Sequence, residues 1–156
     1  MILTSLALAT AAAFAGAAAY INLSEQPARL LLDDASLLKE WKPSYARGFE
    51  MQATLAMVSG LLGLAAFYVE QHPAAALGGV LLLANWPYTL LVMAPNNKAL
   101  ASTADQDAGP ETRARIIRWG KLHAVRTCLG IAGAGAFVCA SLSRRVDGKR
   151  QISKSA

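Results

Sequence analysis

Charged side chains are scarce in this sequence. Asp, Glu, Lys and Arg make up 16% of its 156 residues, whereas ordinary soluble domains contain about 25%. The mean hydropathy is +0.34. Several stretches are almost free of charge over about 20 residues, the length of a helix that crosses a hydrocarbon core about 30 Å thick. The composition therefore argues against a soluble globular domain and predicts an integral membrane protein.

Cysteine and histidine are also few. The two cysteines, Cys128 and Cys139, lie in one apolar run and cannot bridge each other along a single helix. The sequence has no C-x-x-C pair and no cluster of His and Cys, which disfavours a structural zinc site. We expect both cysteines to behave as small apolar residues, and we expect no metal and no cofactor.

The net charge of +5 does not indicate nucleic-acid binding, because the basic residues flank apolar runs. Positive charge beside membrane spans is expected from insertion and from lipid headgroups, so membrane lipid is the expected partner. The two longer connections between apolar runs carry many Lys and Arg residues, and the shortest connection carries none. The positive-inside rule then favours the cytoplasmic side of the plasma (inner) membrane for the long connections.

Four segments are long and apolar enough to span a membrane: approximately residues 2–23, 49–69, 74–93 and 122–142. The predicted fold is all-α, an integral membrane four-helix bundle with a short amphipathic surface helix between the first two spans. The transmembrane domain covers residues 1–142, and the basic tail at residues 143–156 is expected to be disordered. A cleaved signal peptide is the alternative for the first segment. No basic residue precedes its long apolar stretch, however, so we expect a retained helix.

The connections fix the topology. Only "EQHP" separates the second and third spans, so these spans form an antiparallel hairpin with its turn at one membrane surface. The connections at residues 24–48 and 94–121 then both lie at the other surface. Within the first, a leucine-rich stretch at residues 30–41 repeats at near-helical period, and Asp34 can cap this surface helix. Within the second, Pro110 suits the start of a helix that leads into the fourth span.

Small residues recur where helices would have to touch. Ala9, Ala12 and Gly16 share one face of the first span, and Ser59 and Gly63 stand four residues apart in the second. Lipid supplies no hydrophobic drive for helix association, so helices in membranes approach each other closely through small residues. We expect these positions to form helix contacts.

Two ionisable residues lie inside the fourth apolar segment. His123 and Arg126 are about one and two turns from its start, and their helical stripe continues into two glycines. A collar of headgroup-facing side chains explains Lys121 but explains these two poorly. Ionisable groups at such depth face the bundle interior and find a partner. The nearest counter-ions by topology are Glu25 and Glu50.

The third span contains a proline and a polar residue. Pro87 cannot donate to the carbonyl of Leu83, which predicts a kink. Asn85 is deep in the same segment and is expected to bond to another helix or to contact a ligand. Trp41 and Trp119 flank the apolar segments, where an aromatic belt at the membrane surface would account for them.

Four stretches, taken in order, resemble a known family. They are "NLSEQPARL", "WKPSYARG", "NWPYTLLVMAPNNKAL" and "RWGKLHAVRT". With the small-residue first span, their order and spacing resemble the anthrone oxygenase-like family over roughly residues 5–142. The resemblance implies a small four-span membrane protein, and characterised members include oxygenases that convert polyketide anthrones to anthraquinones without a conventional metal or flavin site. The positions that match the family's motifs are Asn97, Trp119, His123 and Arg126.

The resemblance thus implies a cofactor-independent oxygenase of the monooxygenase type, acting on a hydrophobic aromatic small molecule and O₂. An anthrone has an acidic methylene, and the anion left by its deprotonation can react with O₂ directly. His123 is the expected base, and Arg126 and Asn97 are expected to stabilise the oxyanion. Five residues are expected to bind the flat substrate, with a tryptophan stacked on it: Trp86, Trp119, Glu25, Tyr45 and Asn85.

Two other classes of protein fit the same residues. A redox protein with haem or copper would use His123 as a ligand, although metals usually take three or four ligands. A non-catalytic membrane protein, active in lipid or small-molecule binding, transport or assembly, would use Glu25, His123 and Arg126 as a buried polar network that fixes helix packing. Each of these classes of protein is compatible with a homo-oligomer.

Overall fold

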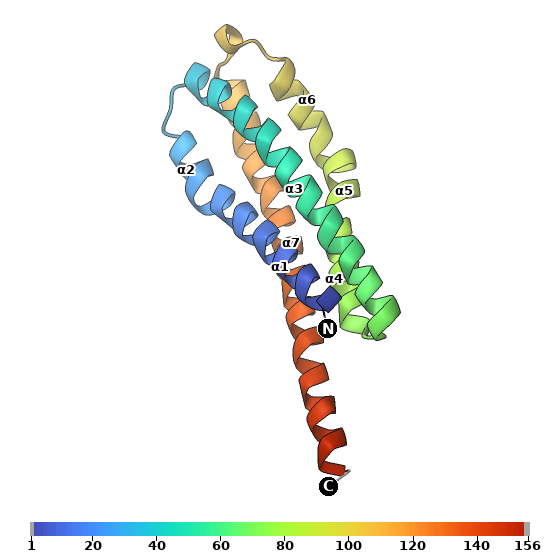
Figure 1. The fold of residues 1–156 in the computed structure, drawn as a ribbon. Coiled ribbons are helices and arrows are strands. Elements are labelled where there is room, and N and C mark those ends of the chain that lie inside the picture. The colour runs from blue at the N-terminus through green and yellow to red at the C-terminus, as the bar shows by residue number, and fades with distance from the viewer. Residues whose placement is uncertain (1, 155–156) are drawn as a thin grey trace.

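The computed structural model describes residues 2–154, with side chains described as far as Ser143, and every regular element in this part of the chain is helical. The elements, coloured along the chain in Figure 1, are α1 (Ile2–Tyr20), the π-helical turn η1 (Ile21–Glu25), α2 (Gln26–Arg29), α3 (Asp34–Glu70), α4 (Pro73–Leu83), α5 (Asn85–Tyr88), the π-helical turn η2 (Thr89–Met93), α6 (Ala94–Ser102), the 3₁₀ turn η3 (Asp105–Asp107) and α7 (Pro110–Lys154). The all-α fold class is confirmed.

Four helical stretches are each long and apolar enough to cross a membrane: Ile2–Arg29, Asp34–Glu70, Pro73–Ser102 and Pro110–Ser143. Each contains one of the four spans predicted from the sequence. They run side by side as a bundle, with the α3–α4 hairpin and the N-terminus at one end and α2, α6 and the start of α7 at the other (Figure 1). The chain is therefore a multi-pass membrane protein.

The predicted tight hairpin joins α3 to α4. α3 ends at Glu70, and Gln71 adopts the left-handed conformation with φ 54°, its N–H donating to the carbonyl of Phe67. Pro73 follows in the first turn of α4, where its missing N–H has no partner to lose. At this same end, the Thr4 hydroxyl of α1 donates to Glu70 at 2.8 Å. The start of α1 therefore lies beside the end of α3.

The expected surface helix is not a separate element. Residues 34–41 of the leucine-rich stretch form the first two turns of α3, which continues without interruption into the second span as one helix of 37 residues, while Leu30, Leu31 and Leu32 precede it. Asp33, and not Asp34, caps it, accepting hydrogen bonds from the N–H groups of Ala35 and Ser36. The bond from the Ser36 N–H holds the pKa of the Asp33 carboxyl below its usual value. Pro43 lies inside this helix and does not end it.

Helix contacts in the bundle use small residues, but not all of those expected. Ser59 donates to the carbonyl of Ala7 at 2.9 Å, which joins α3 to α1. A Cβ on Gly63 would lie 2.9 Å from the Cα of Gly79, so α3 and α4 touch backbone to backbone. The expected face at Ala9, Ala12 and Gly16 is exposed. The buried face of α1 carries Ala7, Ala11, Phe14 and Ala18 instead.

The third span is interrupted at the expected place. α4 ends at Leu83, Ala84 forms a turn, and Pro87 lies in the short α5 before the π-helical turn η2. Because Pro87 has no N–H, the Leu83 carbonyl lacks its normal helical partner, which agrees with the break. α6 then completes this stretch at Ser102 and leads towards the start of α7 (Figure 1).

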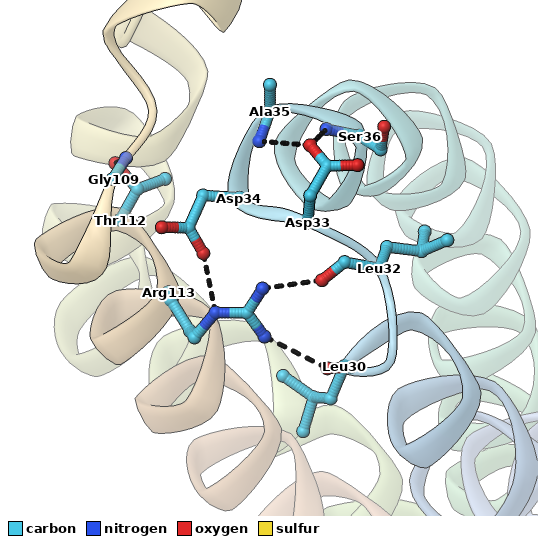
Figure 2. Close-up of polar contacts among 9 residues, drawn as sticks. All are labelled: Leu30, Leu32, Asp33, Asp34, Ala35, Ser36, Gly109, Thr112 and Arg113. Atoms are coloured by element: carbon cyan, nitrogen blue, oxygen red, sulfur yellow. Dashed lines mark hydrogen bonds and ion pairs between the residues drawn. The ribbon is translucent and has the colours of Figure 1, made fainter.

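Arg113 joins the start of α7 to the loop between α2 and α3. Its guanidinium donates to the carboxylate of Asp34 at 2.5 Å and to the carbonyls of Leu30 at 2.9 Å and Leu32 at 2.5 Å (Figure 2). The Leu30 carbonyl ends α2 and the Leu32 carbonyl lies in the loop that follows, so no further helical turn can satisfy them. A single side chain thereby fixes three elements at this end of the bundle.

The predicted start of the last helix at Pro110 is confirmed, and α7 runs from there to Lys154. The basic tail at residues 143–156, expected to be disordered, falls almost entirely on residues whose side chains lie outside the described part of the chain.

The close contact between α3 and α4 predicts a sharp response to one methyl group. In Gly79→Ala, the added Cβ would lie 2.8 Å from the carbonyl oxygen of Gly60 and 3.1 Å from the amide nitrogen of Leu64, so the two backbones must separate. We expect a loss of about 1–3 kcal/mol. Gly16→Ala is the control, because a Cβ at that position would meet no atom of a neighbouring helix within 4 Å. Thermal unfolding in detergent measures both, and equal stability of the two variants would refute this packing.

Arg113→Ala is expected to destabilise the protein by about 1–3 kcal/mol, because it removes three hydrogen bonds made by a charged group. Amide exchange of residues 30–34 should accelerate. Arg115→Ala is the matched control, since among the described residues the Arg115 side chain pairs only with the exposed Glu111 one turn away, and such pairs contribute less than about 1 kcal/mol. Similar losses in both variants would contradict a special role for Arg113.

Candidate functional site

A histidine, an asparagine and a threonine form a hydrogen-bonded group where the end of the first span meets α7. The Nδ1 atom of His123 lies 2.9 Å from Oδ1 of Asn22, and the hydroxyl of Thr127 donates to the same oxygen at 2.7 Å. The Nδ2 group of Asn22 donates to the carbonyl of Gly120 at 2.9 Å. His123 is 1% exposed. The imidazole is therefore held by a residue about a hundred positions away in the sequence.

These contacts determine which ring nitrogen of His123 carries the proton. The Gly120 carbonyl only accepts, so it must face the NH₂ group of Asn22, and the amide oxygen must face His123 and Thr127. An oxygen only accepts, so the Nδ1 of His123 must donate to it. The neutral imidazole then has an unprotonated Nε2. No described residue forms a hydrogen bond with this Nε2 atom.

The local sequence explains how the end of the first span comes so close. A Cβ on Gly120 would lie 2.9 Å from Nε2 of Gln26, so the glycine leaves the space that Gln26 occupies. Gln26 also donates to the carbonyl of Ile116 at 3.0 Å. The π-helical turn η1 contains Asn22 and Glu25, and such turns often occur at functional sites.

An aromatic layer covers His123 on the side of the long connections. The Trp119 ring stacks on the imidazole with centroids 4.9 Å apart. Trp41 meets Trp119 edge to face at 5.9 Å and stacks on Tyr45 at 4.7 Å. Trp41 and Trp119 are both buried, so the interpretation of these two tryptophans as a membrane-surface belt was wrong.

Arg126 has neither of its expected counter-ions. Glu25 binds Arg29 and accepts from the hydroxyl of Ser44, while Glu50 is exposed. Among the described residues, none forms a hydrogen bond or ion pair with Arg126, whose guanidinium lies 5.7 Å from the ring centroid of Phe14. Arg126 is 5% exposed. A buried arginine without a carboxylate is costly, which indicates a site that receives an electron-rich group.

Two small recesses meet at Arg126. The inner recess is lined by Ile21, Glu25, Ser44, Tyr45, Gly48, Phe49, Gln52, Trp119, His123 and Arg126. The second recess is lined by Phe49, Ala53, Ala56, Asn85, Trp86, Thr89, Leu90 and Arg126. Each has a volume of about 10 Å³, which is roughly the space for one water molecule. Phe49 and Arg126 belong to both linings and separate the two spaces.

A larger groove adjoins the inner recess on the outside of the bundle. Its volume is about 430 Å³, and it is lined by Ile21, Glu25, Glu40, Pro43, Ser44, Arg47 and Gly48. Four of these residues also line the inner recess. Sites for small molecules commonly occupy about 300–1,000 Å³, so the groove has the size of an approach to the recess.

The structure brings together most of the residues predicted from the sequence. His123, Arg126, Trp119, Glu25 and Tyr45 line the inner recess. Trp86 and Asn85 line the second recess, which Arg126 and Phe49 separate from the inner recess.

Two predicted residues do something other than expected. Asn97 lies behind the aromatic layer, where its amide donates to the hydroxyl of Tyr45 at 3.2 Å, and it borders neither recess. Asn85 donates to the carbonyls of Leu81 and Leu82 in its own span. The interhelical bond expected for Asn85 is therefore absent among the described residues, because the helix break frees local acceptors.

Sequence reasoning assigned no role at the site to two amides. Asn22 and Gln52 are each placed next to apolar residues near the end of a span, which is also what a simple interfacial residue would show. A polar side chain facing the bundle cannot be told from one facing headgroups until the helix rotation is known. Asn22 and Gln52 lie in other spans than His123. Their closeness to it could be found only from the packing of the first two spans on α7.

The described residues offer little for a metal or haem. No three His, Cys, Asp or Glu side chains in this part of the chain come close enough together to hold a metal ion. At the site itself, His123 is the one imidazole in the recess lining, whereas a copper site usually needs three or four ligands. The donor set therefore does not fit a copper centre, and a recess of about 10 Å³ does not hold a haem.

Comparison with known proteins identifies one family. The sequence model described as "Anthrone oxygenase" matches residues 41–136. The chain is 31% identical over 114 residues to the "Anthrone oxygenase" of Claviceps purpurea, covering 65% of this chain and 66% of that protein, just under two thirds of its length. It is 32% identical over 127 residues to "Anthrone oxygenase tpcL" of Aspergillus fumigatus, covering 73% and 78%. "Anthrone oxygenase AgnL2" of Paecilomyces divaricatus is 28% identical over 136 residues, covering 74% and 82%. No solved structure matches the chain.

The hydrogen bonds of Asn22 predict a spectroscopic signature. In protein labelled with ¹⁵N-histidine, His123 should carry its proton on Nδ1, and Asn22→Leu should abolish this preference because it removes the acceptor. His72→Gln identifies the signals, since the chain has only two histidines. A wild-type His123 protonated on Nε2 would contradict the assigned orientation of Asn22.

Proposed function

The chain belongs to the anthrone oxygenase family, and from this premise we propose that it is a membrane enzyme that oxidises a flat aromatic substrate with O₂. The observation that supports this function best is the pairing of a neutral histidine with an arginine that has no counter-ion among the described residues. Both line one recess, one turn apart on α7. A base beside an unpaired positive charge suits a reaction in which a carbon acid becomes an anion.

The proposed reaction begins with proton transfer. The free Nε2 of His123 takes a proton from the methylene of an anthrone, and the resulting negative charge is delocalised onto the carbonyl oxygen of the substrate. Arg126 stabilises that oxyanion in a recess shielded from water. Asn22 holds the imidazole in the tautomer that can accept, in the manner of an orienting group in other acid–base sites.

The electrons for the oxidation come from the substrate itself. The carbanion carbon forms a bond to one oxygen atom of O₂, and protonation gives a hydroperoxide. Loss of the second methylene proton with cleavage of the O–O bond then leaves a new carbonyl and releases water. Anthrone and O₂ thus become anthraquinone and water, and no external reductant is consumed. His123 is placed to return the first proton and to take the second.

Binding of a three-ring substrate requires side chains to move. Each recess now has room for about one small molecule such as water or O₂. Phe49 lies between the recesses and contacts Tyr45 and Trp86 through ring centroids 6.1 and 6.5 Å away. Rotation of Phe49 would join the two spaces into one slot that ends at Trp86, with Trp119 and Tyr45 on the inner side. The groove at Gly48 provides the approach.

Partners and location follow from the same proposal. The substrates are a hydrophobic aromatic molecule and O₂, membrane lipid surrounds the bundle, and nucleic acid is not a partner. The basic residues of the long connections favour the cytoplasmic side of the plasma (inner) membrane for that end of the bundle. The oxidation needs no bound cofactor, because the carbanion reacts with O₂ directly. Asn97 acts on the aromatic layer through Tyr45 and not on the substrate.

His123→Gln should lower the rate of anthrone oxidation about 100-fold or more, because loss of a general base has effects of about 10²–10⁴-fold. The protein is reconstituted in nanodiscs, and O₂ uptake and anthraquinone formation are measured against empty nanodiscs. His72→Gln, at the opposite end of the bundle, should leave the rate unchanged. Wild-type turnover by the His123 variant would refute the base, and absence of turnover by the wild type would refute the function.

A further inference from the structure

One side chain in the inner recess has no partner in the described part of the fold. Gln52 lies in α3 and is 1% exposed. Neither its amide nitrogen nor its amide oxygen forms a hydrogen bond with any described residue. A buried polar group without a partner costs free energy comparable to a lost hydrogen bond, and this cost is high inside a membrane bundle. Helix packing therefore does not explain why an amide occupies this position.

Other amides in the bundle show what a structural amide does here. The side chains of Asn22, Gln26 and Asn96 each donate to a backbone carbonyl of α7, at 2.9, 3.0 and 3.1 Å. These bonds join helices, which is the usual use of amides between membrane spans. Gln52 makes no such bond to the described residues, although it is at least as deeply buried. Its donor and its acceptor are both left for a bound group.

Several other polar groups of the recess lining are already bonded. Glu25 accepts from the hydroxyl of Ser44, and the hydroxyl of Tyr45 accepts from the amide of Asn97 at 3.2 Å. Of the described side chains that line the inner recess, Gln52 is the one in which a donor atom and an acceptor atom are both buried without a partner. A group that satisfies Gln52 must accept from its amide nitrogen and donate to its amide oxygen.

The size and the neighbours of the recess limit what that group is. A volume of about 10 Å³ admits one small molecule such as water or O₂. Gln52 shares the lining with His123, so oxygen that adds to the carbon from which His123 takes a proton enters the same recess. Arg126 is assigned to the carbonyl oxygen of the substrate, which lies across the ring from that carbon. The oxygen that adds to the carbon therefore needs another protein group to bind it.

The proposed oxidation produces a group that alternates between accepting and donating. The peroxide anion formed by addition of O₂ only accepts hydrogen bonds, and the hydroperoxide formed from it also donates one. When the O–O bond breaks, the outer oxygen again carries negative charge and accepts. A guanidinium or an indole N–H only donates, and a carboxylate only accepts, whereas an amide does both. The free amide of Gln52 therefore matches each of these species in turn.

We infer that Gln52 is a catalytic residue that binds the outer oxygen atom of the substrate peroxide. Its Nε2 group donates to that oxygen in the peroxide anion, and its Oε1 atom accepts from the O–H group of the hydroperoxide. His123 then removes the second proton from the reacting carbon, and the electrons of that C–H bond form the π bond of the new carbonyl. The O–O bond breaks with its electron pair on the outer oxygen, which takes the proton from His123 and leaves as water. The inference rests on the proposed function.

Binding of the peroxide can be measured without chemistry on anthrones whose reacting carbon carries no hydrogen. In 10-hydroperoxy-10-methylanthrone, that carbon bears a methyl group and the peroxide, so the second proton transfer cannot occur. In 10-methoxy-10-methylanthrone, a methyl group replaces the outer O–H, and the number of non-hydrogen atoms is the same. The affinities of the two compounds therefore isolate the contribution of the outer oxygen.

Both affinities are determined by quenching of tryptophan fluorescence, with wild-type protein and Gln52→Met reconstituted in nanodiscs. We expect wild type to bind the hydroperoxide about 10-fold more tightly than the methyl ether, the effect of about one hydrogen bond. In Gln52→Met, a variant of similar length without the amide, the ratio should fall to about one. Gln71→Met in the exposed hairpin should keep the wild-type ratio. A wild-type ratio of about one, or equal ratios in wild type and Gln52→Met, would overturn the inference.

A kinetic measurement tests the role of Gln52 in O–O cleavage. Loss of one donor to a developing oxyanion slows a reaction about 100-fold or more, so Gln52→Met should accumulate 10-hydroperoxyanthrone during oxidation of anthrone. Mass spectrometry of acid-quenched samples measures the hydroperoxide, and empty nanodiscs control for spontaneous oxidation. Affinity for anthrone under nitrogen should stay at the wild-type value, because anthrone has no outer oxygen. Oxidation by Gln52→Met at the wild-type rate without accumulated hydroperoxide would contradict the assignment.

Thermal unfolding distinguishes peroxide binding from a structural role. Replacing an unpartnered amide by an apolar side chain should leave the unfolding midpoint of Gln52→Met unchanged or raise it. A lower midpoint together with an unchanged affinity ratio would mean that Gln52 serves packing or holds only a water molecule, and the inference would be overturned. Gln52→Leu repeats both measurements if the methionine variant does not fold.

The outcomes also separate this inference from the proposed function. Selective binding of the hydroperoxide by a wild-type protein that consumes no O₂ would overturn the oxidation and support peroxide binding by Gln52. Oxidation with equal affinity ratios in wild type and Gln52→Met would support the proposed function and overturn the role of Gln52.

Discussion

The site depends on the close approach of the end of the first span to α7 at Gly120. Because this residue has no side chain, Gln26 fits against α7 and Asn22 reaches the carbonyl of Gly120. The side-chain oxygen of Asn22 then accepts a hydrogen bond from Nδ1 of His123 and fixes the imidazole. A larger residue at position 120 would separate the two helices and release the imidazole. The packing of the first span on α7 therefore also sets the orientation of the His123 imidazole.

The low polarity inside a membrane bundle makes each polar contact informative. Arg29 is buried beside Glu25 and Glu40, so its charge is compensated within the fold. Arg126 is buried as deeply without such a pair among the described residues, and Gln52 is buried there without any bond. In a soluble protein, water often satisfies such groups. Here the contrast between paired and unpaired groups supports the proposal that this part of the bundle binds a ligand.

The aromatic layer covers one side of the site. Tyr45 stacks on Trp41, Trp41 meets Trp119 edge to face, and Trp119 stacks on His123, so that the aromatic layer covers one side of the imidazole. The inner recess is instead adjoined by the groove next to Gly48, which the proposed function uses as the approach. The first turns of α3, which carry Trp41 and Tyr45, thereby shape both the cover and the approach.

The sequence by itself determined the four spans, the α3–α4 hairpin and the placement of both long connections at one end, because length, charge and the short "EQHP" turn leave few alternatives. It also singled out His123 and Arg126, since ionisable residues are rare inside apolar segments. Only the tertiary structure decided what these residues face. The rotation of α1 turned Ala7 inward and Gly16 outward, the pairing of Arg29 removed Glu25 from Arg126, and Asn97 was placed behind Tyr45. Such choices depend on contacts between residues far apart in the chain, and helical periodicity alone does not specify which face of a mostly apolar helix packs inward.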